Sequence, residues 1–256
     1  MTEPFDLHIR NRRRIYLMRH GEAAYVSPDG VVTSDPRAVP LTAEGRQQAN
    51  LQGQVLSGIG FDRAICSGLR RTRETAEHVL AQNSSHRVPR LEIIGGLEEI
   101  QGMRGERAWP PASHERNAAL ADIANPWARG ASQGARFLGG ELFSDFETRV
   151  QEAWQNLIGA EDWKCLLVVA HGGVNRMILN LLTGLPWRGD LCFEQDNGCI
   201  NIIDIDPTSP PRYLIRAINI TAYNLSKSGI VMTNMEATAQ RVAAILKQTN
   251  PDQPAG

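Results

Sequence analysis

Two histidines in this sequence each follow an apolar run that has the composition of a buried strand. The run IYLM (residues 15–18) ends in RHGE, and the run LLVVA (166–170) ends in HGGVNR. Charged and polar groups directly after a buried strand are costly unless they are paired or used for chemistry. A neutral imidazole can act as a nucleophile, and a neighbouring guanidinium can hold an anionic group. His20, Arg19 and His171 are therefore the first candidates for a reaction centre.

Glycines follow both histidines and indicate that an anion binds there. Gly21 and Gly172 let the backbone approach a ligand closely. A helix expected directly after His171 would present free N–H groups and the positive end of its dipole. A lone histidine at a strand end is more often structural than catalytic. Two of them in matching contexts, one beside an arginine, favour a shared site.

Two further motifs carry charged groups at the ends of expected strands. The segment SGLRRTRETAEH (67–78) opens a helix with Arg70, Arg71 and Arg73. Guanidinium groups have a planar fork of donors that suits phosphate oxygens, although at least one of the three also fits a solvated helix face. The segment LEEI (97–100) places the carboxylates of Glu98 and Glu99 after another strand, where such a pair usually lies simply at the surface.

Alternation of strand and helix patterns predicts an α/β sheet with helices on both faces. The helix expected over 42–57 has Thr42 as its N-cap, and the one over 144–158 has Ser144. Ligands of such sheets bind at the carboxyl ends of the strands, where Arg19 and His20 fall. The last two strands are nearly consecutive, so part of the sheet is expected to be antiparallel at an edge. The strands are expected at 14–18, 61–66, 91–94, 166–170, 199–204 and 212–219, and the remaining helices at 68–82, 173–183 and 235–248.

Residues 103–138 interrupt this alternation. The stretch contains WPP and NPW, several glycines and one short helical pattern at 113–123, which together indicate an inserted lid or cap. We expect one domain over 1–256 that carries this insertion, with a loose tail at 249–256. Trp109, Trp127, Arg129, Arg136 and Phe137 are candidate contacts of a ligand under the lid, each weighed against plain packing within it.

Composition narrows the class of protein. The net charge of −1 argues against binding nucleic acid through general electrostatics, and 42% hydrophobic residues can form a sizeable core. No apolar run approaches the roughly 20 residues of a membrane span, and the N-terminus has no signal-peptide core. The cysteines form no CxxC pair, which favours small core residues in a reducing compartment and no metal site. We expect a cytoplasmic protein with no membrane and no nucleic-acid partner. The four cysteines are Cys66, Cys165, Cys192 and Cys199.

The ordered set of motifs resembles the histidine phosphatase superfamily, the group that also contains the cofactor-dependent phosphoglycerate mutases. The resemblance runs from about Arg14 to about Asp204. An isolated RHG is a weak signal, whereas the order and spacing of the whole set are specific. The matching pieces are RHGE (19–22), Leu41-Thr42 with Gly45, SGLRR (67–71) with Thr75-Ala76, LEEI (97–100), Gly140-Glu141, Arg149-Val150 and HGG (171–173).

The resemblance implies a three-layer α/β/α fold with a mostly parallel central sheet, and a mechanism. His20 would be the nucleophile, with its other ring nitrogen held by a backbone carbonyl. Arg19, Arg71 and His171 would surround the phosphoryl oxygens, while Arg70 and Arg73 lie at the surface. Glu99 is the best match to the general acid and Glu98 the second. The phosphate-binding residues would be Arg19, Gly21, Glu22, Arg71 and Gly172, with no metal and no cofactor.

Two departures from the family pattern bear on function. Many relatives have a hydroxyl residue after RHGE and an asparagine three positions further, where this chain has Ala23 and Val26. Thr33, Ser34 or Asn197 would replace a lost phosphate contact if the fold brings one of them near. The stretch after RHGE also lacks the asparagine and tryptophan residues with which the mutases grip phosphoglycerate.

The lack of the mutase stretch favours a phosphatase over a mutase, whereas the changes at Ala23 and Val26 leave a binding module open. The leading hypothesis is a metal-independent phosphomonoester hydrolase that acts on a small phosphorylated metabolite. One alternative is a cofactor-dependent phosphoglycerate mutase, and the other is a non-catalytic phosphate-binding or phosphoprotein-binding module on the same fold. The physiological substrate and the oligomeric state, including a homo-oligomer, stay open at this point.

Overall fold

A computed structural model describes residues 12–25, 35–85, 88–102, 113–129, 132, 134–184, 193–206, 208 and 210–249, without the side chains of 113–116, 129 and 245–249. Its centre is a six-stranded sheet with the order β3-β2-β4-β1-β5-β6. The first four strands of that order are parallel, and β5 and β6 add antiparallel pairs at one edge. The predicted mixed sheet is confirmed. The strands are β1 (Arg13–Arg19), β2 (Arg63–Cys66), β3 (Leu91–Ile93), β4 (Cys165–Ala170), β5 (Ile200–Asp206) and β6 (Arg212–Ile220).

The register of the two central strands brings the histidine motifs together. β1 and β4 are parallel neighbours, and Arg19 pairs with Ala170 at their carboxyl ends. His20 and His171 are the next residues of the two strands, and the His20 N–H donates to the Ala170 carbonyl at 3.1 Å. The expected meeting of the two motifs at one edge of the sheet is therefore confirmed.

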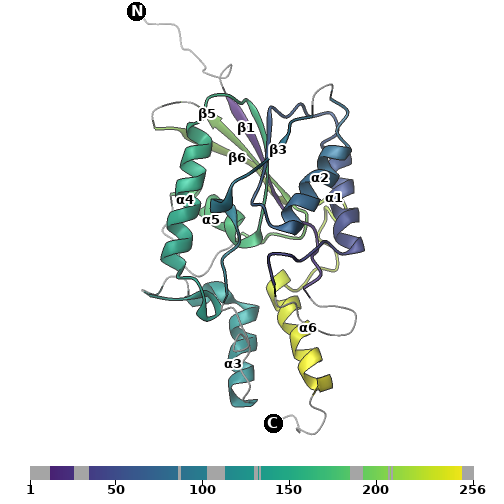
Figure 1. Ribbon diagram of the computed structural model, residues 1–256, viewed down its shortest axis with the longest axis vertical. Helices are drawn as coiled ribbons and strands as arrows, with labels where there is room; N and C mark the ends of the chain where they lie inside the picture. Colours follow the sequence, from purple (N-terminus) through teal and green to yellow (C-terminus); the bar gives the residue numbers. More distant parts are fainter. Residues whose placement is uncertain are drawn as a thin grey trace, which may run out of the picture.

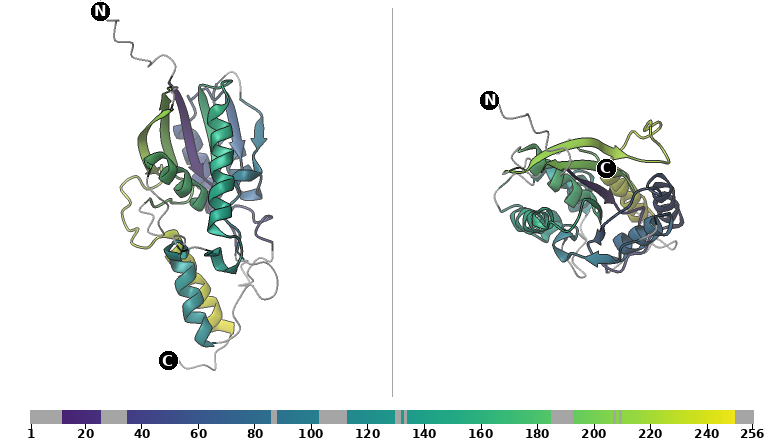
Figure 2. Two further views of the ribbon diagram at one scale, coloured as in Figure 1. Left: turned by 90° about the vertical axis from the view of Figure 1, so that its left-hand side faces the viewer. Right: turned by 90° about the horizontal axis from the view of Figure 1, so that it is seen from above.

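Helices cover both faces of the sheet, as predicted. Tyr16 and Met18 of β1 pack in a core with α2 (Arg70–Ala81) and with Leu56, the C-cap of α1 (Ala43–Val55). Ile15 and Leu17 alternate to the other face, toward α4 (Phe143–Gly159) and α5 (Gly172–Thr183). Figure 2 shows these two helical layers on opposite sides of the sheet.

One of the two predicted helix caps is confirmed and the other is wrong. Thr42 caps α1, and its hydroxyl accepts from the Gly45 N–H at 2.9 Å. Ser144 is not the cap of α4, because the helix begins at Phe143 and Leu142 occupies the cap position, without a side-chain hydrogen bond. Leu142 is held there by a β-bridge to Arg136, a tertiary contact that local sequence preference does not contain.

The insertion contributes a helix that pairs with the C-terminal helix. The expected short helix is α3 (Ser113–Ala124), and α6 (Asn234–Thr249) lies against it. Both extend from the edge of the sheet at which the parallel strands end (Figure 1). Two short 3₁₀ turns, Pro126–Arg129 and Phe137–Gly139, lead from α3 back to α4, and a third, Gly95–Leu97, follows β3. Trp109 and the tail after residue 249 lie outside the described residues.

No helix in the part of the chain that the structure describes is long and apolar enough to cross a membrane.

Candidate active site

The two histidines form a buried pair at the carboxyl end of the sheet. Their ring centroids are 5.2 Å apart and the ring planes meet at 65°. His20 is 3% exposed and His171 is fully buried. Imidazoles that are buried this close together cannot both be positively charged without strong repulsion, so the site favours neutral rings.

The hydrogen bonds of His20 define which of its nitrogens can react. Nδ1 lies 2.7 Å from the carbonyl oxygen of Gly21, and a carbonyl only accepts, so Nδ1 carries the proton. Nε2 then has the free lone pair, and Nε of Arg71 donates to it at 3.3 Å. Burial, followed by the charges of Arg71 and Arg19, holds the pKa of His20 well below its ordinary value. This is the state that a nucleophilic imidazole requires.

Two arginines enter the site from neighbouring elements. Arg71, 2% exposed in the first turn of α2, also donates from Nη1 to the Pro36 carbonyl at 2.7 Å. Arg19 ends β1, and its Nη1 donates to the carbonyl of Gln195. The Nε of Arg19 is buried and has no hydrogen-bond partner among the described residues. A Cβ on Gly172 would lie 3.4 Å from this Nε, so the first residue of α5 leaves room beside it.

The remaining two arginines of the RRTR segment lie away from the site. Arg70 is 56% exposed on its side chain and pairs with Glu74 at 2.7 Å, and Arg73 is exposed. The structure thus separates Arg71 from its two neighbours in the way expected from the family pattern.

Ser67 orients His171, a role that the sequence did not reveal. The hydroxyl of Thr72 donates to the Leu69 carbonyl, so the Ser67 hydroxyl must donate to Thr72 at 2.9 Å. Ser67 is then the acceptor for Nε2–H of His171 at 2.8 Å. Nδ1 of His171 keeps its lone pair and is buried without a partner among the described residues. Burial first, then Arg71 and His20, lowers the pKa of His171 well below the ordinary value.

The two candidate carboxylates have different surroundings. Glu99 accepts from the backbone N–H of Gly173, in the first turn of α5, and of Ile100, each at 3.0 Å. Glu98 forms a two-point ion pair with Arg37 instead. This places the Glu99 carboxylate beside the residue that follows His171-Gly172, and turns Glu98 toward a half-exposed arginine.

Arg149 of α4 fixes the loop that carries these carboxylates. Its guanidinium donates to the carbonyls of Gly96, Glu98 and Glu99 and pairs with Glu141 at 2.7 Å. Glu141 and Arg149, the residues of the two later motif pieces, therefore hold the backbone of this loop in place.

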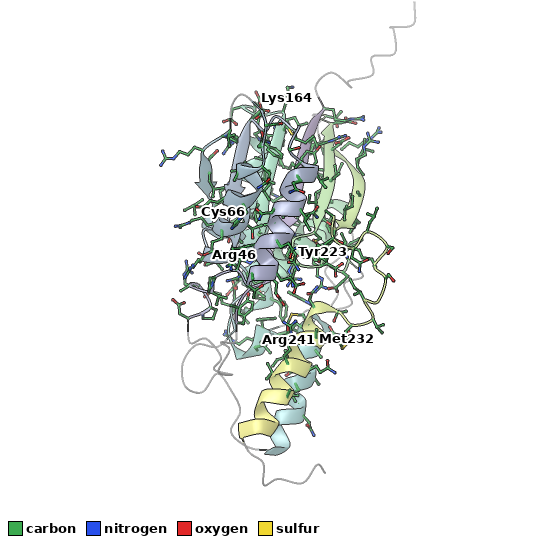
Figure 3. The ribbon with its side chains drawn as sticks, turned by 90° about the vertical axis from the view of Figure 1, so that its right-hand side faces the viewer. Arg46, Cys66, Lys164, Tyr223, Met232 and Arg241 are labelled. Atoms are coloured by element: carbon green, nitrogen blue, oxygen red, sulfur yellow. The ribbon has the colours of Figure 1, made fainter. Side chains whose placement is uncertain are left out.

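Gly21 and Glu22 join the end of β1 to α1. A Cβ on Gly21 would lie 2.3 Å from the carbonyl oxygen of Gly45, so only glycine fits this crossing. The carboxylate of Glu22 accepts from the Thr42 hydroxyl at 2.9 Å and pairs with Arg241 of α6 at 3.1 Å. Figure 3 shows Arg241 on α6, at the end of the sheet opposite Lys164. Glu22 is thus a brace between three elements next to the nucleophile candidate.

Among the described residues no group of three or more histidines, cysteines or carboxylates could hold a metal ion. The charges that surround His20 are those of arginines. Any stabilisation of a phosphoryl group by this set of side chains comes from guanidinium and imidazole donors.

Comparison with known proteins identifies the family to which this chain belongs. The sequence model of the histidine phosphatase superfamily (branch 1) matches residues 15–217. The chain belongs to the histidine phosphatase superfamily. It is 34% identical over 197 residues to the adenosylcobalamin/alpha-ribazole phosphatase of Escherichia coli K12, covering 75% of this chain and 90% of that protein.

Further relatives carry two kinds of name. A protein of Serratia proteamaculans named "Probable phosphoglycerate mutase GpmB" is 30% identical over 196 residues, covering 75% of this chain and 84% of that one. The crystal structure of the alpha-ribazole phosphatase of Shigella flexneri superposes with a TM-score of 0.62 at 30% identity, over 80% of this chain and 96% of that one. These relatives agree with the phosphoglycerate mutase-like α/β/α fold expected from the motifs.

Within this family fold, the insertion reaches the candidate acid. A Cβ on Gly173 would lie 2.4 Å from Oε1 of Glu99 and 2.5 Å from Cη2 of Trp127. Trp127 is 7% exposed and packs on Phe137 and Phe143. Its ring therefore lies both in the core of the insertion and next to the carboxylate of Glu99.

Two other candidate contacts of the insertion, Arg136 and Phe137, make their described contacts elsewhere. Arg136 is exposed and donates to the Gly140 carbonyl at 2.7 Å, and Phe137 packs against the core. Trp109 and the side chain of Arg129 lie outside the described part of the chain.

Of the two positions that depart from the family pattern, the structure describes Ala23 but not Val26. Ala23 forms an isolated bridge with Leu41 and so belongs to the loop that joins β1 to α1. Val26, Thr33 and Ser34 lie outside the described residues. The carbonyl of Asn197 accepts from the Tyr223 hydroxyl at 2.9 Å.

Proposed function

We propose that this protein is a metal-independent phosphomonoester hydrolase that works through a covalent phosphohistidine on His20. The observation that carries the proposal is the state of that ring. Nδ1–H is committed to the Gly21 carbonyl, and Nε2 keeps its lone pair beside Arg71, in a ring that is only 3% exposed. Membership of the histidine phosphatase superfamily and a 34% identical phosphatase relative support the same chemistry.

The reaction has two balanced steps. In the first, the lone pair on Nε2 of His20 attacks phosphorus, the ester P–O bond breaks, and Glu99 gives a proton to the leaving oxygen. In the second, Glu99 takes a proton from water, the hydroxide attacks phosphorus, and the P–N bond breaks to release phosphate. The carboxyl of Glu99 returns to its starting state, and His20 is neutral again.

Arg19, Arg71 and His171 are the groups proposed to stabilise the transferring phosphoryl group. The Nε of Arg19 and the Nδ1 of His171 are both buried polar atoms without a protein partner among the described residues. Such atoms are costly to bury unless a ligand meets them. An incoming phosphate monoanion would satisfy both, because it can accept from Nε–H of Arg19 and donate its own O–H proton to the lone pair on Nδ1 of His171. Each donor that then holds the phosphoryl oxygens is typically worth about 10²–10³ in rate.

The substrate class is a small phosphorylated metabolite. Alpha-ribazole phosphate is the first compound to test, because the names of the relatives in Escherichia coli and Shigella flexneri refer to alpha-ribazole. We propose a cytoplasmic location, since Cys66, Cys165 and Cys199 are free thiols among the described residues.

A phosphoglycerate mutase is the second candidate, favoured by the GpmB relative. The two activities differ in whether the phosphohistidine is discharged to water or to an acceptor hydroxyl. A non-catalytic phosphate-binding module is the third, and it predicts binding without turnover.

One experiment separates these functions. Phosphate release from a panel of phosphomonoesters is measured in EDTA for the wild type, His20→Ala and His78→Ala. His78 lies on α2 and hydrogen-bonds Asn50 outside the site, so it is the matched control. Release that survives EDTA and disappears only in His20→Ala is the expected result. Conversion of 3-phosphoglycerate without release would favour the mutase, and binding without either reaction would favour the module.

A further inference from the structure

Residues 193–196 form a short strap beside Arg19 of the site and Arg176 of α5. The carbonyl of Gln195 accepts from Nη1 of Arg19, the arginine that ends β1. The carbonyl of Phe193 accepts from Nε of Arg176 at 2.8 Å, and Glu194 pairs with the same guanidinium. The strap thus receives hydrogen bonds from Arg19 beside His20 and from Arg176 on α5.

The strap is held in turn by residues that follow β6. The side-chain amide of Asn234 donates to the Gln195 carbonyl at 3.1 Å, so this one oxygen accepts from both Asn234 and Arg19. Lys227 reaches Asp196 at 2.7 Å. The strap is therefore connected at Gln195 and Asp196 to the C-terminal segment, residues 221–249, which lies beyond the family match that ends at residue 217.

The start of α6 is built to hold Asn234 in place. Thr233 and Glu236 form a capping box, in which the Glu236 N–H donates to the Thr233 hydroxyl at 3.1 Å and the Glu236 carboxylate accepts from the Thr233 N–H at 2.7 Å. Asn234 is the residue that follows the cap. Its amide therefore has a defined direction toward the strap, which a frayed helix end would not give.

The side chain of Gln195 fixes the strap from below. It is fully buried and exchanges two hydrogen bonds with Asn201 of β5, at 2.7 Å and 3.0 Å. Asn201 also donates to the Leu17 carbonyl in β1 at 3.0 Å. A buried polar network of this kind gives its members one arrangement. The side chain of Gln195 is therefore fixed. The direction of its backbone carbonyl depends in addition on the hydrogen bond from Asn234.

We infer that the C-terminal segment is part of the active-site scaffold, and that Asn234 is a positioning residue which orients the guanidinium of Arg19 through the Gln195 carbonyl. This inference rests on the proposed function, because it assumes that Arg19 binds the phosphoryl group. It assigns a role in phosphate binding to a helix outside the family match, and it links the α3–α6 pair to the site.

The test compares Asn234→Ala with Asn83→Ala. Asn83 also donates its amide to a backbone carbonyl, that of Ile59 at 2.8 Å, but it follows α2 at the far end of the sheet. We expect Asn234→Ala to lower kcat/KM and the affinity for orthovanadate by about fivefold each, and Asn83→Ala to change neither. Asn234→Asp, which keeps the size but turns a donor toward the carbonyl into an acceptor, should lose at least as much. Thermal unfolding checks that each variant folds.

The double variant identifies the route. In an Arg19→Lys background, Asn234→Ala should cause no further loss of vanadate affinity, because the group it positions is gone. An equal loss in both backgrounds, or no difference between Asn234→Ala and Asn83→Ala, would overturn the inference. A wild type that binds vanadate but releases no phosphate would instead refute the proposed function, and the vanadate measurements would still test the role of Asn234.

Discussion

Replacing Glu99 by glutamine should slow the reaction by an amount that depends on the leaving group. Glutamine has the size of glutamate but cannot give a proton to the ester oxygen. For alkyl phosphates, whose leaving oxygen needs that proton, we expect kcat to fall by about 10²–10⁴. For p-nitrophenyl phosphate, whose leaving group departs as an anion, the first step should change little.

The structure also predicts a second effect of Glu99→Gln that is independent of the substrate. Both carboxylate oxygens now accept from backbone N–H groups, of Gly173 and Ile100. The new amide turns an NH₂ toward one of these donors, which we expect to cost about 1–3 kcal/mol of folding stability. Thermal unfolding measures this cost separately from kcat.

The control for this prediction is Glu98→Gln. Glu98 pairs with Arg37, whose side chain is 49% exposed, so we expect a loss of at most about 1 kcal/mol of stability and a rate within a few-fold of the wild type. The assay is phosphate release from an alkyl phosphate and from p-nitrophenyl phosphate, by both variants. Equal losses for the two substrates in Glu99→Gln, or a larger selective loss in Glu98→Gln, would refute the assignment of the acid.

Three further predictions concern the surroundings of His20. Arg71→Ala should lower kcat/KM by about 10²–10³, whereas Arg70→Ala, which removes a surface ion pair, should leave it nearly unchanged; a comparable loss in both would contradict the separate roles. Gly173→Ala should shift Glu99, since its Cβ would meet Oε1 at 2.4 Å, and should therefore slow alkyl phosphates more than p-nitrophenyl phosphate; an unchanged substrate ratio would speak against it. Because burial lowers the pKa of His20, the folded ring stays neutral where the unfolded one takes up a proton, so the free energy of unfolding should fall as pH drops below about 6.5. Urea unfolding across this range should show a weaker fall in His20→Ala, and an identical pH dependence in both proteins would refute the shift.

Much of the site could be predicted because it depends on local patterns and on one rule of topology. Apolar runs that end in RHGE and HGG were enough to predict two strands with histidines at their ends. Parallel neighbouring strands then bring both ends to one edge. Thr42 as the cap of α1 is a local preference of the same kind, and it is confirmed.

The parts that sequence patterns missed depend on contacts between distant residues. Serine is a common helix cap, but the bridge between Arg136 and Leu142 places the cap of α4 at Leu142, two residues before Ser144. The helix patterns of α3 and α6 were visible, whereas their pairing was not, because about a hundred residues separate them along the chain.

Contacts between distant residues also separate the two candidate carboxylates. The motif LEEI ranks Glu99 before Glu98 by its position in the motif alone. In the structure Arg37, from a distant loop, pairs with Glu98, and the N–H of Gly173 meets Glu99. Ser67 was part of a recognised motif, but its bond to His171 spans 104 positions and has no local signal.

Capture of the covalent intermediate is the most direct test of a phosphohistidine on His20. The enzyme is mixed with p-nitrophenyl phosphate and quenched within milliseconds into alkali, in which phosphohistidine survives, and its peptides are weighed by mass spectrometry. We expect one added phosphoryl group on the peptide that contains His20, its loss when the substrate is exhausted, and its absence from His20→Ala. Steady phosphate release with an unmodified His20 peptide, or with the phosphoryl group on another residue, would show that His20 is not the nucleophile.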